Sequence, residues 1–554
     1  MNNKILNIKW RKSILLPTAS LRASLFLLGC LAMAPAGHGQ WSYWYPGSGD
    51  WSDASLWDPL GTLPDNTRNV DIRGAVNITG PAASASSYVN GGTVNVMTGG
   101  GWTNSNLFIA DLTSGQNGVM TISGGGTVAT SGEGRVESAA EARVTGAGSL
   151  WDVASYLQLG IAIGGTAGGT LEVSADGSVK TPEIFFYNNS TLVVGAPSGQ
   201  TAVAPGNVDV LNLTGGAEST LIFNHADTSG SYAFSANING INLLHESGIT
   251  TLSSGIGSVS SATVAGGNLY LKSPLMANEI SVKNGGNLTA RLTPSSGPSF
   301  APLSAPHISV EAGGTLNAFS GLTVPAGGSV VVNGTLSHLA WLGAGTTSLS
   351  ITDGTTLSGN GRLSATTITI GDDGILAPGN SPGKLEVSAL GGHIWEGGGI
   401  YEWEINAAGG VQVANWDLID VIHGPLNITA DSSNPFILKL SSLNTGNTPG
   451  ALIDWDPTQN YDWPIASVTG PLGIIDGFDP GDIFIDYESA FDDYNTIDGV
   501  FSLNHVGNSL VLHYEANDIT AIPEPGSAVA LALLLTSSVG LHRQRGKKSR
   551  SQGS

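Results

Sequence analysis

The residues of this sequence best suited to chemistry are acidic, and they gather near the end of the chain. Eight carboxylates occur with no lysine or arginine among them: Asp476, Asp479, Asp482, Asp486, Glu488, Asp492, Asp493 and Asp498. Carboxylate oxygens are ligands for Ca²⁺, and extracellular Ca²⁺ sites are often weak. The spacing does not follow the EF-hand pattern, so weak Ca²⁺ binding in 476–498 and a solvated acidic face both stay open. We expect no resident metal or cofactor.

No catalytic arrangement accompanies these acids. Polysaccharide-cleaving β proteins need paired carboxylates around a sugar bond, or Ca²⁺ beside a basic group. The histidines are scattered without the spacing of a zinc site, and no glycine-rich run continues into the Gly-Lys-Ser/Thr of a phosphate-binding loop. The sequence therefore predicts no catalytic residues and a protein that is not an enzyme. The alternative is a polysaccharide lyase or glycosidase.

Tryptophan is concentrated directly after residue 40, at Trp41, Trp44, Trp51 and Trp57. Aromatic residues at one end of a glycine-rich β chain are typical of a layer that closes a solenoid. The alternative is a carbohydrate-binding module in which Trp51 and Trp57 stand exposed in a row and contact a glycan. We expect the capping role and place this N-terminal cap at 40–80.

The composition indicates an elongated β protein. Of 554 residues, 78 are Gly and only 12% are charged, which is far from the composition of helical bundles. The formal charge is −22, but five basic residues lie in the first 22 positions and five in the last twelve. The body, 40–542, then has 11 basic and all 43 acidic residues, a net charge of −32. Such a body repels phosphate backbones, so we expect no nucleic-acid partner.

The first 39 residues have the pattern of a secretory signal peptide. A basic start precedes the apolar stretch 23–36, and small residues occur at Ala34, Ala36 and Gly39. The only cysteine, Cys30, lies in this stretch, so ordinary cleavage leaves a chain without disulfides. Its lipobox-like context, Leu27-Leu28-Gly29, makes lipidation the alternative.

The C-terminal region 517–554 contains a tripartite signal. Pro523, Glu524 and Pro525 precede an apolar segment, 527–541, and then a basic end. At 1.5 Å per residue, a helix over this segment is shorter than the ~30 Å apolar core of a bilayer, which favours transient membrane insertion. This tail resembles the PEP-CTERM sorting domain of Gram-negative bacteria. The resemblance implies that an exosortase recognises Pro-Glu-Pro and delivers the protein to the cell surface or extracellular matrix.

A repeat of about fifty residues occupies 81–205. The segment 151–159 resembles 102–109 in sequence, and 169–179 resembles 118–128. Each unit combines a run of alternating apolar and polar residues with a glycine-rich corner. Strands this short cannot bury a core alone, so they must stack on neighbouring coils. The repeats resemble those of autotransporter (type V secretion) passengers and PEP-CTERM proteins, including the part 144–151. The resemblance and the pattern together predict a parallel β-helix.

The same pattern continues without a clean period over 206–390. It ends in Ala377-Pro378-Gly379-Asn380-Ser381-Pro382-Gly383, which is similar to a signature near the end of autotransporter-like β-helices. We interpret this string as a rigid structural corner. Alternating runs in 391–516 predict a β-rich C-terminal cap. The segment 517–554 is too short for a translocator barrel, so we expect no self-export by that route.

Together these features predict an all-β chain, a right-handed parallel β-helix (solenoid) with a β-rich C-terminal cap and a single apolar C-terminal helix. We expect a secreted or surface-anchored structural or adhesive protein. Its expected partners are an exosortase and extracellular polysaccharide or neighbouring surface proteins.

Overall fold

The computed structural model describes residues 40–517, apart from positions 46, 111–116, 138, 161–167, 292–301, 320, 340–346, 471–472 and 489. The described chain is built from β-strands and has no α-helix, only two short 3₁₀ turns, η1 (Ala54–Leu56) and η3 (Pro480–Asp482). None of its helices is long and apolar enough to span a membrane. The predicted signal peptide, sorting motif and C-terminal apolar helix lie outside the described residues.

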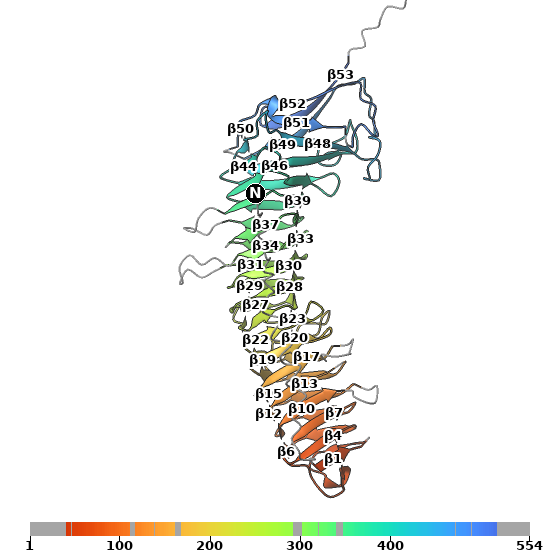
Figure 1. The fold of residues 1–554 in the computed structure, drawn as a ribbon, viewed down its shortest axis with the longest axis vertical. Helices are drawn as coiled ribbons and strands as arrows, with labels where there is room; N and C mark the ends of the chain where they lie inside the picture. The colour runs from red at the N-terminus through yellow and green to blue at the C-terminus, as the bar shows by residue number, and fades with distance from the viewer. Residues whose placement is uncertain are drawn as a thin grey trace, which may run out of the picture.

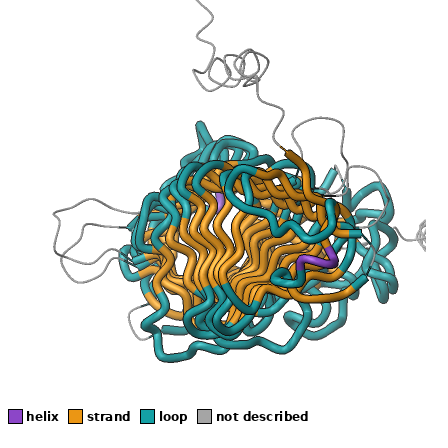
Figure 2. Tube along the Cα trace, turned by 90° about the horizontal axis from the view of Figure 1, so that it is seen from below, coloured by secondary structure: helices purple, strands orange, loops and turns teal. Residues whose placement is uncertain are grey.

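The strands stack into a long rod (Figure 1). Viewed along the rod, strands of successive coils lie over one another (Figure 2). The strand β11 (Val119–Ser123), for example, pairs in parallel with β8 (Thr93–Val96) on one side and β14 (Glu141–Thr145) on the other. Met120 and Ile122 point inward and are fully buried, while their neighbours face outward. The predicted all-β class with long parallel sheets is confirmed.

Two sheets are confined to the N-terminal half. The ten-stranded sheet contains β25 (Asn237–Asn239), β22 (Asn212–Thr214), β19 (Glu183–Phe186), β16 (Tyr156–Leu159), β13 (Glu133–Val136), β10 (Asn106–Ala110), β7 (Ser86–Asn90), β4 (Arg68–Ile72), β1 (Gln40–Trp44) and β3 (Trp57–Asp58). The six-stranded sheet contains β21 (Asn207–Asp209), β18 (Ser178–Lys180), β15 (Leu150–Val153), β12 (Thr127–Thr130), β9 (Gly101–Asn104) and β6 (Pro81–Ala83).

A third sheet, the long sheet, continues through both halves of the rod. Besides β8, β11 and β14 it contains β2 (Ser48–Asp50), β5 (Ala75–Ile78), β17 (Thr170–Ser174), β20 (Thr191–Gly195), β23 (Thr220–Asn224), β26 (Asn242–Ser247), β28 (Ser258–Val264), β30 (Leu275–Val282), β32 (Leu303–Ser304), β33 (His307–Val310), β35 (Leu322–Thr323), β36 (Ser329–Val332), β39 (Thr356–Gly359), β42 (Ile375–Pro378), β45 (Ile400–Ile405), β48 (Phe436–Ser442) and β51 (Ile483–Asp486).

The C-terminal half replaces the first two sheets by two others. A twelve-stranded sheet contains β24 (Ala233–Phe234), β27 (Ile249–Leu252), β29 (Gly267–Leu271), β31 (Gly286–Ala290), β34 (Thr315–Ala318), β37 (Thr335–His338), β40 (Arg362–Ala365), β43 (Lys384–Ala389), β46 (Leu418–His423), β49 (Tyr461–Val468), β53 (Ser509–Ala516) and β52 (Gly499–Val506). A five-stranded sheet contains β38 (Ser348–Ile351), β41 (Thr367–Ile370), β44 (His393–Trp395), β47 (Leu426–Ile428) and β50 (Ile475–Asp476).

Antiparallel strands are found at the two ends of the rod. At the N-terminal end β3 pairs antiparallel with β1, and at the C-terminal end β53 pairs antiparallel with both β49 and β52. At each end the antiparallel pairing extends one sheet: the ten-stranded sheet at the N-terminal end and the twelve-stranded sheet at the C-terminal end. The other sheets end there in parallel strands, β2 and β6 at the N-terminal end and β51 and β50 at the C-terminal end.

The glycine-rich corners allow neighbouring coils to approach closely. Gly125 has φ +84°, a left-handed conformation that side chains disfavour. A Cβ atom on Gly126 would lie 2.5 Å from the carbonyl oxygen of Val96 in the preceding coil. Glycine is required at this corner because no side chain fits between the two backbones.

The proline- and glycine-rich corner at 377–383 is held by a buried carboxylate. One oxygen of Asp417 accepts a hydrogen bond from the Gly383 amide (2.7 Å), and the other accepts one from the Glu404 amide (3.0 Å). Asp417 is fully buried, and this burial raises its pKa well above the usual range. The described contacts of this corner are those of a structural element.

Candidate functional site

Trp51 and Trp57 form part of the core at the N-terminal end. Their exposed fractions are 3% and 0%, and their rings meet edge to face at 4.7 Å. The indole nitrogen of Trp57 donates a hydrogen bond to the carbonyl oxygen of Trp51 (3.0 Å). This packing corrects the expectation, under the carbohydrate-module alternative, that both rings are exposed for stacking. Of the two, only Trp51 borders a surface hollow.

The acidic residues of 476–498 do not converge. Asp479 accepts a hydrogen bond from the Gly481 amide at the start of η3, and Asp498 accepts one from the side chain of Asn517. In the part of the chain that the structure describes, no three His, Cys, Asp or Glu side chains are grouped closely enough to hold a metal ion. The described geometry therefore offers no formed cation site for this run.

The outer face of the ten-stranded sheet carries a ladder of large side chains. Tyr88, Phe108 and Arg135 occupy the same register position on β7, β10 and β13. The Tyr88 and Phe108 rings stack with centroids 4.9 Å apart, and the Arg135 guanidinium lies 5.1 Å from the Phe108 centroid. Phe108 thus has a partner on each neighbouring coil.

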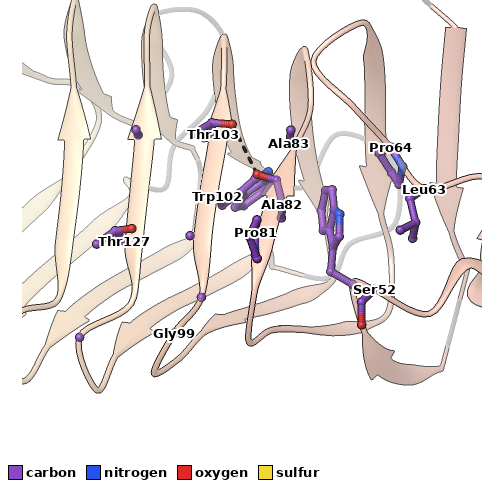
Figure 3. A pocket seen from close by; sticks show the side chains of 15 residues that line it. Ser52, Leu63, Pro64, Pro81, Ala82, Ala83, Gly99, Trp102, Thr103 and Thr127 are labelled. Carbon is purple, nitrogen blue, oxygen red and sulfur yellow. Dashed lines mark hydrogen bonds between the residues drawn. The ribbon is translucent and has the colours of Figure 1, made fainter.

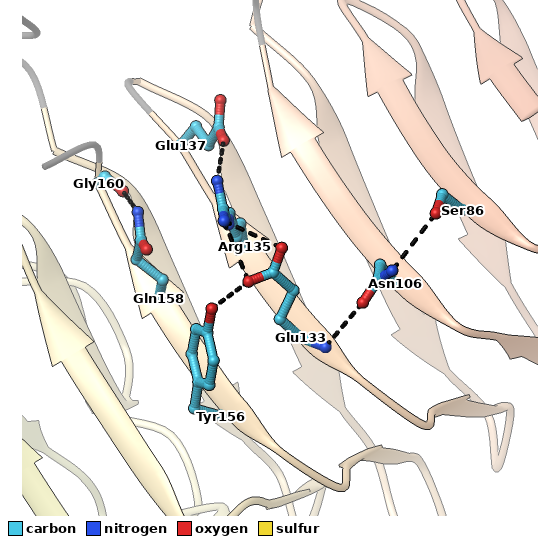
Figure 4. A network of polar contacts seen from close by, with 8 residues as sticks. All are labelled: Ser86, Asn106, Glu133, Arg135, Glu137, Tyr156, Gln158 and Gly160. Atoms are coloured by element: carbon cyan, nitrogen blue, oxygen red, sulfur yellow. Dashed lines mark hydrogen bonds and ion pairs between the residues drawn. The ribbon is translucent and has the colours of Figure 1, made fainter. Parts of the chain in front are cut away.

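Ion pairs complete this ladder (Figure 4). One nitrogen of Arg135 donates to both carboxylate oxygens of Glu133 (2.9 and 3.0 Å), and another lies 3.8 Å from Glu137. The Tyr156 hydroxyl also donates to Glu133. Burial raises the pKa of Glu137, and burial together with Glu133 raises the pKa of Tyr156 to about 12. Both carboxylates are engaged by Arg135, so this cluster is better suited to joining coils than to acid–base chemistry.

The outer face of the six-stranded sheet is lined by small side chains. Register places Gly101 beside Thr127, and Thr103 beside Ala129, on β9 and β12. A hollow of about 620 Å³ lies over these strands, with Trp51 and Trp102 also in its lining. Figure 3 shows Thr103 and Thr127 on successive strands, with Leu63 and Pro64 at one end of the hollow.

This hollow continues along the rod. A second hollow of about 500 Å³ shares Thr103 and Ala129 with the first, and a third of about 390 Å³ shares Asp152 and Ala154 with the second. The third extends to Asp209 on β21, the last strand of the sheet. We call the three hollows together the trough. It follows the rod axis across the whole six-stranded sheet.

A buried polar layer lies beneath the middle of the trough. Asn104 is 5% exposed and alternates inward with Trp102 on β9, so its side-chain amide faces the core and not the trough. Neither polar atom of this amide has a hydrogen-bond partner among the described residues, and both are closed to solvent. In the same layer the Trp102 indole donates to Ser84 (3.0 Å), and the Trp151 indole donates to Thr130 (3.2 Å).

Charged groups are few in the trough. Those in its lining are Asp152, Lys180 and Asp209, with the lysine and Asp209 at its far end. The sequence alone does not reveal this site, because Thr103, Ala129 and Asp152 are unremarkable residues that become neighbours only through strand register. Small residues recurring at one position of each coil were the available signal.

Comparison with protein-family models and with curated proteins finds no match for this chain.

Proposed function

We propose that this chain is a secreted structural and adhesive rod of a Gram-negative bacterium, displayed at the cell surface or in the extracellular matrix. In this proposal the parallel coils form a right-handed β-helix. An exosortase processes the tail at Pro523, Glu524 and Pro525 after transient membrane insertion. The side faces of the rod then contact extracellular polysaccharide.

The observation that carries this proposal is a long stack of parallel coils in which one sheet continues through both halves of the rod. Such a stack presents a continuous face on coil after coil. Many weak polar contacts along one face suit attachment to a repetitive polymer. The sequence has basic residues at both ends and a strongly acidic body between them. This distribution supports export of the body and disfavours binding to nucleic acid.

Sorting is tested by replacing Pro523, Glu524 and Pro525 with alanine in a Gram-negative host that has an exosortase. The matched control replaces Asn517 and Asp518, just before the motif. Each variant is analysed by cell fractionation and by mass measurement of the C-terminus. We expect the wild type and the control to reach the surface with a shortened tail, and the motif variant to stay in the membrane fraction. Equal processing of all three would contradict the proposal.

The adhesive role is tested on extracellular polysaccharide extracted from the same host. We expect the purified full chain to sediment with the polysaccharide and to release no new reducing ends. Release of reducing ends would favour the lyase or glycosidase alternative, and failure to sediment would contradict adhesion.

A further inference from the structure

We propose that the trough on the six-stranded sheet is a binding site for one chain of a neutral polysaccharide, lying along the rod axis. This inference rests on the proposed function, because it names the ligand class that the adhesive rod would bind. It goes further in assigning the contact to one face and to particular residues.

The shape of the trough fits an extended polymer. Its three hollows adjoin one another through shared lining residues, so together they extend from Pro81 at one end to Asp209 at the other. Neighbouring strands lie ~4.8 Å apart, which is close to the rise of one sugar unit in an extended β-linked chain. Each sugar would therefore meet one coil. Because Gly101, Thr103 and Ala129 are small, a flat sugar ring can approach the backbone.

Polar groups in the trough suit hydroxyl groups. Ser105 and Ser131 are exposed, and their hydroxyls line the middle hollow. A hydroxyl both donates and accepts hydrogen bonds, so it matches the hydroxyl groups of a sugar. A ligand rich in hydroxyl groups would be held by several such weak contacts along the trough.

The charge of the trough favours a neutral polysaccharide over an acidic one. The trough lining has two carboxylates, Asp152 and Asp209, against the single ammonium group of Lys180. The surrounding body has a strong net negative charge. A polyuronate would bring one carboxylate per sugar against this surface without matching cations, and the repulsion would oppose its binding.

The test measures binding of hexasaccharides to the full-length chain purified in mild detergent, by calorimetry. The probes are β-1,4-glucan and β-1,3-glucan hexamers as neutral chains and a polygalacturonate hexamer as the acidic chain. We expect at least one neutral hexamer to bind, with an affinity that is insensitive to salt, and the acidic hexamer to bind at least tenfold more weakly. No binding of either neutral hexamer, or tighter binding of polygalacturonate, would overturn the proposal.

Two variants locate the site. Thr103→Trp fills the trough and should weaken neutral-hexamer binding more than tenfold. Its matched control, Thr214→Trp, places the same ring on the outer face of the ten-stranded sheet and should leave binding unchanged. Unfolding midpoints confirm that both variants are folded. Equal effects of the two tryptophan variants on neutral-hexamer binding would overturn the assignment.

The outcome is separable from that of the sorting proposal. If the chain reaches the surface but no neutral hexamer binds, the trough assignment fails and the surface role stands. If the purified chain binds a neutral hexamer but the motif variant is sorted normally, the sorting proposal fails and the trough assignment stands.

Discussion

The outer faces of the ten-stranded and six-stranded sheets lie on the same coils but have opposite characters. On the ten-stranded sheet, Tyr88, Phe108 and Arg135 fill the surface and contact one another from coil to coil. On the six-stranded sheet, Gly101, Thr103 and Ala129 leave an open trough.

This difference indicates which face of a repeat protein is available to bind a ligand. Both faces contain polar groups, but the Glu133 carboxylate is already bound by Arg135 and Tyr156, so a ligand would have to displace these partners to reach it. The small side chains of the trough leave open space for a ligand instead. The emptier face is therefore the better binding surface, even though the other has more aromatic and charged residues.

The largest effect should come from the floor of the trough. Trp102 is 1% exposed, and its indole donates to Ser84, so Trp102→Ala should lower the free energy of unfolding by about 3–5 kcal/mol through the cavity that it creates. Urea denaturation measures the change. Trp102→Phe, which keeps most of the ring volume, should cost less. A loss below about 1 kcal/mol for Trp102→Ala would show that the trough floor is not part of the core.

Acid should weaken the rod beyond the end of the six-stranded sheet. The buried Thr250 hydroxyl contacts the Nε2 atoms of His225 (2.7 Å) and His245 (3.1 Å), and burial lowers the pKa of His245 to about 4. The unfolded histidine binds its proton near pH 6.5, so the stability contributed by neutral His245 is complete above that pH. It falls by about 3 kcal/mol as the pH drops to about 4.

The check is urea denaturation of the wild type and His245→Asn between about pH 7 and pH 4. The variant should lose less stability on acidification, whereas His307→Asn, at an exposed histidine, should behave like the wild type. If the free energy of unfolding fell equally with pH in the wild type and in His245→Asn, protonation of His245 would not be the cause.

The stacked ladder should contribute to stability and not to binding. Phe108→Ala removes the contacts with Tyr88 and Arg135 and should lower the free energy of unfolding by about 1–2 kcal/mol, with neutral-hexamer affinity unchanged. On the six-stranded sheet the opposite result is expected: Thr103→Ala should leave the free energy of unfolding unchanged and weaken neutral-hexamer binding. If Phe108→Ala weakened binding instead, the contrast between the faces would be broken.

The smallest effect should come from the buried acid of the ladder. The pKa of Glu137 is raised by burial, so the folded state gains stability as the pH falls through that raised pKa toward the ordinary value for glutamate. Glu137→Gln should change stability at pH 7 by less than about 1 kcal/mol and abolish this gain on the acid side. Urea denaturation of the wild type and the variant at neutral and acid pH measures both effects. If the free energy of unfolding of Glu137→Gln rose on acidification as much as that of the wild type, Glu137 would not be the cause.

The repetitive part of the fold could be predicted because its signals are local. Alternation in 119–123 indicated which side chains point inward, and Met120 and Ile122 are buried as that pattern requires. The corner at Gly126 was visible as a glycine-rich turn. Which carboxylate holds the later proline-rich corner was not visible, because Asp417 and Gly383 are 34 positions apart and meet only in the folded coils.

The candidate site could not be predicted for the same physical reason. Trp51 and Trp57 stood out by residue type, but burial covers their faces. Thr103, Ala129 and Asp152 carry no distinctive chemistry, and their importance arises from the space that small side chains leave when register aligns them. That space depends on the alignment of coils that are separated by irregular loop lengths.

The division of the rod into two sets of sheets has a mechanical consequence. Hydrogen bonds between coils point along the rod, so a pull on its ends strains them in the direction in which they break. The coil interfaces act in series, and the one with the fewest paired strands yields first. Between β25 and β38 the described coils are joined by the long and twelve-stranded sheets, without a third sheet in the described residues. A rod under tension should therefore part in its middle, leaving two folded halves, before its ends unravel.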